Sequence, residues 1–164
     1  MTATEPIPPI AGTVTVGVPV EQAFGLFTGE FTAWWPHQYH IGQAEVAEIL
    51  LEPHVGGRWY ERDVDGSECD WGRVLLWDAP NRVMLMWQLS AQFQFDRSIE
   101  TEVDVCFTAL DAQTTRVDLE HRRLDMYGAD AAAMRETFSS PSGWNGMLEH
   151  YAQVAGKLAA AART

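Results

Sequence analysis

His121 and Glu61 are the two ionisable residues whose predicted positions suit acid–base chemistry. The strand pairings that the turn residues predict place both side chains on the inner side of a sheet, where an ionisable group needs a partner or water. A histidine there could orient a ligand or transfer a proton near neutral pH. The other interpretation, a histidine whose hydrogen bonds are satisfied at the end of a strand, stays open.

Three histidines on predicted loops invite a metal interpretation. His37, His40 and His54, with Glu45 and Glu52 nearby in sequence, have side chains of the types that bind zinc. They lack the helical His-x-x-x-His or the cysteine pair that would fix the geometry of the ligands. We therefore interpret them as surface loop residues and predict no metal and no cofactor.

The sequence has no recognisable catalytic nucleophile. Its serines lie in predicted turns, Gly-x-Ser-x-Gly is absent, and neither Cys69 nor Cys106 has a basic residue close by in sequence. The two cysteines match no metal or redox spacing, which suits a reducing cytosol. On these grounds we assign no catalytic residue.

Charge narrows the classes of partner. Eleven lysines and arginines against 23 aspartates and glutamates give a net charge of −12. Such a surface repels phosphate backbones and anionic lipids, which excludes nucleic acid and membrane surfaces as partners. The polar, proline-rich start of the chain is no signal peptide, and no apolar run could span a bilayer, so we predict a cytoplasmic protein.

The elements that must position these residues follow from apolar periodicity. Residues 1–12 are expected to form a flexible arm, and residues 13–164 a single domain. A first strand over 13–18 is followed by two short helices, which begin at Val20 and Phe31. Short connections favour an antiparallel meander of the remaining strands. These are predicted at 46–52, 57–64, 69–77, 82–90, 99–110 and 115–124.

The last helix has a different period from the sheet. From Ser142 to Leu158 the apolar residues recur at helical spacing, whereas in the strands they alternate. This is the long amphipathic helix available to cover the apolar face of the sheet, and a brief alanine-rich helix over 128–137 precedes it. A cavity is expected between the final helix and the sheet.

Turn residues set the pairing of the middle strands. We expect a two-residue turn at Asp65-Gly66 and a four-residue loop over 78–81. The predicted pairs are Trp59 with Gly72, Glu61 with Asp70, Gly72 with Trp87, Val74 with Leu85 and Leu76 with Val83. Gly72 would then make room between two indoles on the inner face.

The outer side of the same strands is less polar than a solvent-facing surface usually is. A patch of this kind often marks an interface, so a homodimer through this face is one hypothesis. A slipped register would instead bury these side chains. They are Trp71, Leu75, Trp77, Met84 and Met86.

A series of short motifs runs through almost the whole chain. They are Val-Pro-x-x-x-Ala-Phe at 18–24, Trp-Trp-Pro at 34–36, Gly-Gly-Arg-Trp-Tyr-Glu at 56–61, Trp-Gly-Arg-Val at 71–74, Pro-x-Arg-Val at 80–83, Val-x-Leu-x-His at 117–121 and Ser-Gly-Trp at 142–144. In their order and spacing the chain resembles the START-like (SRPBCC) superfamily, and within it the branch of the activator of the heat shock protein 90 ATPase. The resemblance implies an α+β helix-grip fold. A curved antiparallel sheet of about six or seven strands would wrap around a long C-terminal helix, with two short helices after the first strand.

The expected function is non-catalytic binding of a small apolar or aromatic molecule between sheet and helix. Inward aromatic side chains would supply contact area, and His121 and Glu61 would orient the polar end of the ligand. Plain core packing explains the aromatic residues equally well. The predicted ligand-binding residues are Trp59, Glu61, Val74, Leu85, Trp87, His121, Trp144, Met147 and Tyr151.

Two other functions stay open. A cyclase, aromatase or hydrolase-like enzyme would use His121 or Glu61 as general acid or base, which requires a pKa near neutrality and an adjacent void. The resemblance also implies a protein-interaction module that acts on a chaperone ATPase. We rank the chaperone partner last, because the domain lacks a second segment that could bridge a large partner.

Overall fold

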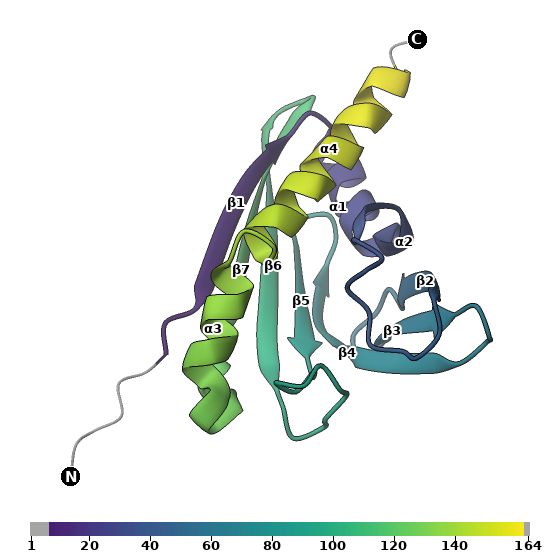
Figure 1. Cartoon of the computed structure of the whole chain (residues 1–164). Coiled ribbons are helices and arrows are strands. Elements are labelled where there is room, and N and C mark those ends of the chain that lie inside the picture. The colour runs from purple at the N-terminus through teal and green to yellow at the C-terminus, as the bar shows by residue number, and fades with distance from the viewer. Residues whose placement is uncertain (1–6, 163–164) are drawn as a thin grey trace.

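One antiparallel sheet forms the frame of the molecule (Figure 1). The computed structural model describes residues 7–162. Within them seven strands are arranged in the order β1-β7-β6-β5-β4-β3-β2, so that β2 to β7 form a meander and β1 adds to its end. Their bounds are β1 Ile10–Val16, β2 Val46–Leu51, β3 Arg58–Asp63, β4 Glu68–Asp78, β5 Arg82–Trp87, β6 Thr101–Asp111 and β7 Thr114–Arg122.

β1 begins earlier than predicted. Residues 10–12, which we expected to belong to a flexible arm, continue the pairing with β7, and Ile10 lies opposite His121. Ile10 is buried, so the extra residues add apolar contact as well as backbone hydrogen bonds. The first six residues of the predicted arm lie outside the described part of the chain.

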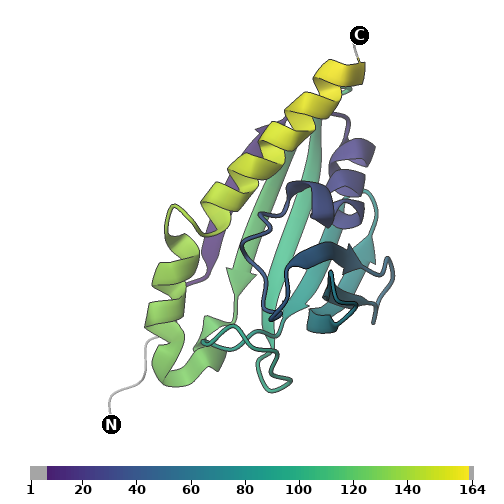
Figure 2. The ribbon, with the colours of Figure 1, turned by 45° about the vertical axis from the view of Figure 1, so that its right-hand side comes forward.

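Helices cover one face of the sheet. α1 (Val20–Gly29) and α2 (Phe31–Trp34) follow β1, and a 3₁₀ segment η1 (Leu124–Asp130) leads into α3 (Ala131–Ser139). The long helix α4 (Trp144–Ala162) runs diagonally across the sheet, as Figures 1 and 2 show. The predicted helix-grip fold is confirmed. None of the helices within residues 7–162 combines the length and the apolar character needed to cross a membrane.

The long helix contacts the sheet through a single stripe of side chains. The buried residues of α4 are separated by one, three or four positions, the spacing of one helix face. Alternate residues of β6 point toward this side, as the period of two predicts. The buried set comprises Trp144, Met147, Leu148, Tyr151 and Ala155 on α4, with Thr101, Val103, Val105 and Phe107 on β6.

Three of the predicted strand pairs are observed. Trp59 lies opposite Gly72, Gly72 opposite Trp87, and Val74 opposite Leu85. The need for glycine at position 72 has a different cause from the one we expected. A Cβ atom there would collide with the carbonyl oxygen of Met86, so the close approach of two backbones excludes a side chain.

Two predicted pairs are wrong, because β-bulges shift the register. A bulge between Trp59 and Tyr60 moves Glu61 opposite Cys69. A second one after Val74 moves Leu76 opposite Met84. The turn after β3 also differs: it has three residues, 64–66, and ends in a glycine with a φ of 87°.

The bulges turn two tryptophans inward that the pairing scheme placed outside. Trp71 is only 1% exposed, and the ring of Trp77 lies 5.1 Å from that of Phe24. For these two residues the alternative prediction is therefore correct: a shifted register buries their side chains. The outer apolar patch shrinks to Leu75, Met84 and Met86, which are half-buried, and the homodimer stays a prediction.

Aromatic rings fill the middle of the fold. Six of the seven tryptophans are buried, and neighbouring rings lie in direct contact, with centroid distances such as 5.5 Å between Trp59 and Trp71. The same cluster includes Phe27, Phe31, Trp34, Trp35, Trp87, Trp144 and Tyr151. Because these rings occupy the space between α4 and the sheet, the ligand-sized volume that we expected there lies at one end of the cluster.

Candidate functional site

A cavity of about 400 Å³ lies where the connection between α2 and β2, the connection between β5 and β6, and α3 come together. These segments lie at the same end of the sheet in Figure 2. We call this space the end cavity. It is lined by Trp35, Gln38, Tyr39, His40, Ile41, Trp71, Trp87, Leu89, Phe93, Thr137, Phe138, Ser142, Gly143 and Met147. Its size and mostly apolar wall are typical of a small-molecule site.

The wall of the end cavity is made mainly of aromatic rings. Trp35 lies 5.2 Å from Trp71 and 6.3 Å from Trp87, measured between ring centroids. Phe138 meets Trp87 edge to face at 5.6 Å. Phe93 stands at the opening, 38% exposed, with a φ of 56° that non-glycine residues rarely adopt. Strained residues of this kind cluster at functional sites, so Phe93 is a candidate for ligand contact.

His121 lies behind this wall in a closed chain of hydrogen bonds. The indole N–H of Trp144 donates to Nδ1 of His121 at 3.0 Å, and Nε2 of His121 lies 2.9 Å from the hydroxyl of Thr101. That hydroxyl donates to the carbonyl oxygen of Trp87. Burial lowers the pKa of His121 to about 3, so the ring is neutral and both of its nitrogens are engaged.

Glu61 is buried and held by three donors. Its Oε1 accepts hydrogen bonds from the backbone of Ile41 at 2.6 Å and from the indole of Trp71 at 3.0 Å, and the N–H of Gly42 lies 3.3 Å from both carboxylate oxygens. Burial raises the pKa of Glu61, but the hydrogen bonds with Asp63 and these donors outweigh it, so the pKa lies below its ordinary value.

Asp63 is the second acid at this place, and the sequence did not single it out. It is 2% exposed and lies beside Glu61 on the same side of β3. Burial, together with the hydrogen bond and the negative charge of Glu61, raises the pKa of Asp63 to about 6. His40 completes the group, with Nδ1 3.3 Å from Oε2 of Glu61. A metal could be held here, because one ligand atom from each of the three residues lies within 4.8 Å of the others.

The predicted ligand-binding residues fall into three groups. Trp87 and Met147 line the end cavity. Glu61 does not line the cavity, but it contacts three residues of the wall: His40, Ile41 and Trp71. The others lie in the packed core or behind the wall: Trp59, Val74, Leu85, His121, Trp144 and Tyr151.

Several lining residues were missed, each for a recognisable reason. Trp71 was placed outside because it is itself the extra residue of a bulge in β4, which leaves no mark in the local pattern. Trp35 belongs to the Trp-Trp-Pro motif, which could have suggested it. His40 was grouped with His37 and His54, and only the path of its loop brings it to the carboxylates. Phe93 and Phe138 belong to a connection and to α3, whose approach to the sheet depends on long-range contacts.

A second, wider hollow of about 600 Å³ lies between α2 and α4. The two spaces adjoin each other, since both are lined by Trp35, Gln38, Tyr39, Ser142 and Met147. His37 and His150 face this hollow, and both rings contact backbone carbonyls of α2, those of Thr32 and Trp34. Its wall is more polar than that of the end cavity, which makes it a weaker candidate for an apolar ligand.

Solved structures of other proteins are similar to this chain. An anthrahydroquino-γ-pyrone synthase, Txn09, is 35% identical, covers 93% of this chain and 99% of its own, and has a TM-score of 0.64. CalC, a self-sacrificing resistance protein from Micromonospora echinospora, is 29% identical over 91% of this chain and 94% of its own, with a TM-score of 0.68. A Nitrosomonas europaea protein shares the fold at 12% identity, covers 96% of this chain and 99% of its own, and has a TM-score of 0.65. No family model and no curated protein matches the chain.

Proposed function

The chain belongs to the START-like superfamily of helix-grip proteins, and we propose that it binds a planar aromatic small molecule in the end cavity. The observation that supports this most directly is the wall of Trp35, Trp71, Trp87 and Phe138 around a space of about 400 Å³. Flat rings stack favourably on such side chains, both by burying apolar area and by the geometry of ring pairs.

The polar groups at the opening suggest how the ligand would be oriented. Gln38, His40 and Ser142 belong to the lining, whereas the depth of the cavity is apolar. A molecule with a flat aromatic body and hydroxyl or carbonyl groups along one edge fits this distribution. The name of the 35% identical synthase refers to a fused aromatic ring system, which supports the same class of ligand for this chain.

Quenching of tryptophan fluorescence by 1,8-dihydroxyanthraquinone tests the proposal. We expect saturable quenching by the unmodified protein and roughly tenfold weaker binding by Phe93→Ala, which removes ring contact at the opening without removing a fluorophore. Leu110→Ala is the matched control, because Leu110 is also an exposed apolar residue but is no part of the cavity. Absence of quenching, or equal affinity of the two variants, would contradict the proposal.

A second candidate is ring closure on the bound molecule, favoured by the name of the same synthase. The acid–base group would then have to face the cavity. His121 has both nitrogens engaged and Glu61 lies behind Trp71, whereas His40 is part of the lining. We therefore assign the proton transfer to His40, backed by the Glu61 carboxylate.

Chromatography of polyhydroxylated anthraquinone precursors after incubation with the protein tests this candidate. A product peak that His40→Gln loses, although this variant still shows saturable quenching, would support it. His54→Gln, which alters an exposed loop histidine, is the control. Turnover that survives in His40→Gln would remove the assignment.

A further inference from the structure

His40, Glu61 and Asp63 converge beneath the connection between α2 and β2. Glu61 and Asp63 are buried, His40 is partly exposed, and their ligand atoms all lie within 4.8 Å of one another. Gly42 packs directly on the two acids, and a Cβ atom at this position would collide with the carboxylate of Asp63. The loop is therefore closed over the carboxylates.

Two polar atoms of this group have no hydrogen-bond partner among the described residues. They are Nδ1 of His40 and Oδ1 of Asp63, and both atoms are buried. A buried polar atom without a partner destabilises the fold, because it has lost its hydrogen bonds to water. Asp63 is 2% exposed, so bulk water does not satisfy it. The two atoms belong to the same small cluster, which indicates that a common partner completes it.

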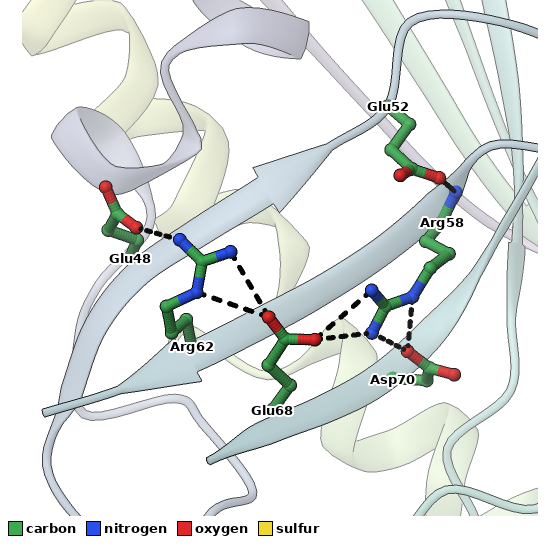
Figure 3. Close-up of polar contacts among 6 residues, drawn as sticks. All are labelled: Glu48, Glu52, Arg58, Arg62, Glu68 and Asp70. Atoms are coloured by element: carbon green, nitrogen blue, oxygen red, sulfur yellow. Dashed lines mark hydrogen bonds and ion pairs between the residues drawn. The ribbon is translucent and has the colours of Figure 1, made fainter. Parts of the chain in front are cut away.

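The charge of the cluster is not balanced by an arginine or lysine. Along β3, Arg58 and Arg62 point away from Glu61 and Asp63. On the opposite side of the strand they pair with Glu48, Glu68 and Asp70, as Figure 3 shows. Within residues 7–162 no ion pair joins an arginine or lysine to either buried acid. Two adjacent buried carboxylates either share a proton or, when both are charged, need a cation close by.

We propose that His40, Glu61 and Asp63 bind a divalent transition-metal cation of the Zn²⁺ class, which makes His40 a metal ligand and excludes the proton-transfer role of the second candidate function. An imidazole and two carboxylates are ligands that zinc accepts, with a water in the fourth position. Nδ1 of His40 and Oε2 of Glu61 are 3.3 Å apart. That separation is close to the edge of roughly 3.4 Å that a tetrahedron has when its metal–ligand bonds are about 2.1 Å long.

The partners of Glu61 suit this role. Its Oε1 is held by the N–H groups of Ile41 and Trp71, which leaves Oε2 directed toward His40. Such outer hydrogen bonds orient a metal-binding carboxylate. Since His40, Ile41 and Trp71 also line the end cavity, the cation would tie the loop to β3 and stiffen one side of the cavity.

Calorimetric titration of the chelator-treated full chain with Zn²⁺ tests the proposal. We expect one site, weakened at least about tenfold in both Asp63→Asn and His40→Gln, since even the loss of an outer partner can cost that much. Asp63→Asn keeps the shape of the side chain, and His40→Gln changes a partly exposed residue, so at least one variant should keep the fold. His54→Gln should bind as the unmodified protein does.

A second measurement distinguishes binding at this site from adventitious binding to surface histidines. Co²⁺ should give visible absorption bands in the unmodified protein and in His54→Gln, and none in Asp63→Asn. Three results would overturn the proposal: no binding of Zn²⁺, unchanged affinity in both cluster variants, or an equal loss in His54→Gln. Far-UV circular dichroism of each variant verifies that the fold is intact.

Discussion

The indole of Trp144 donates a 3.0 Å hydrogen bond to Nδ1 of His121, which makes Nε2 the protonated nitrogen of the ring. Nε2 can then donate to Thr101, whose hydroxyl donates onward to the carbonyl of Trp87. One tautomer of a neutral histidine thus joins α4, β7, β6 and β5. The residue that looked most suited to acid–base chemistry holds the core together, and a proton added to it would break the chain.

Acid should therefore destabilise the protein through His121. Burial lowers the pKa of His121 to about 3, whereas the unfolded chain takes up this proton near pH 6.5. Between these values the unfolded state binds more protons, so stability falls as the pH falls, by about 1.4 kcal/mol per unit. Urea unfolding at pH 6.5 and pH 5 should show this slope in the difference between the unmodified protein and His121→Gln. The same comparison with His54→Gln should give no such difference.

Thr101→Val should be costly although it keeps the shape of the side chain. The substitution leaves Nε2 of His121 and the carbonyl of Trp87 without their partner in a fully buried place. We expect a loss of roughly 1–3 kcal/mol in the free energy of unfolding. Thr108→Val, on the exposed end of the same strand, should change it by less than about 0.5 kcal/mol. Equal effects would mean that the chain of hydrogen bonds contributes nothing measurable.

Two glycines should respond in opposite directions to alanine. Gly72→Ala would force a Cβ atom onto the carbonyl of Met86, and we expect a loss of roughly 3 kcal/mol or more because a backbone has to move. Gly25→Ala, on the exposed side of α1 with nothing near the added atom, should stabilise by roughly 0.5–1 kcal/mol. Thermal melts of the two variants should shift to lower and higher temperature, respectively.

Tyr127→Phe should loosen one wall of the end cavity. The hydroxyl of Tyr127 donates a 2.7 Å hydrogen bond to the carbonyl of Leu89, at the start of the connection that carries Phe93. Burial raises the pKa of Tyr127, so the group stays a donor at all ordinary pH values. Loss of this bond should cost about 1 kcal/mol and speed amide hydrogen exchange over residues 88–98. Tyr39→Phe, whose ring is exposed, should leave that exchange unchanged.

The fold could be predicted because the apolar patterns that indicate its strands and its long helix are periodic. Alternation in β6 and β7 and the helical spacing from Trp144 to Tyr151 each recur over several turns or residues, so a local error does not hide them. Gly72 further anchored the pairing of three strands. Beyond this glycine the bulges change the register by one residue. No residue type in the sequence indicates where these bulges occur.

The site could be predicted only in part, because most of it is built by connections. Trp87 and Met147 were found since they lie on regular elements whose faces follow from the period. Phe93 and His40 owe their places to contacts distant in sequence, such as the bond from Tyr127 to Leu89 and the approach of His40 to Glu61. Local sequence patterns do not predict such long-range contacts.

The opposite charges on the two sides of β3 also protect the molecule against misassembly. If β3 paired one residue out of step, Arg58 and Arg62 would enter the aromatic interior and the two acids would face solvent. Guanidinium groups among indoles without a counter-ion would be too costly to persist. The charge pattern of this single strand thus disfavours the wrong alignment.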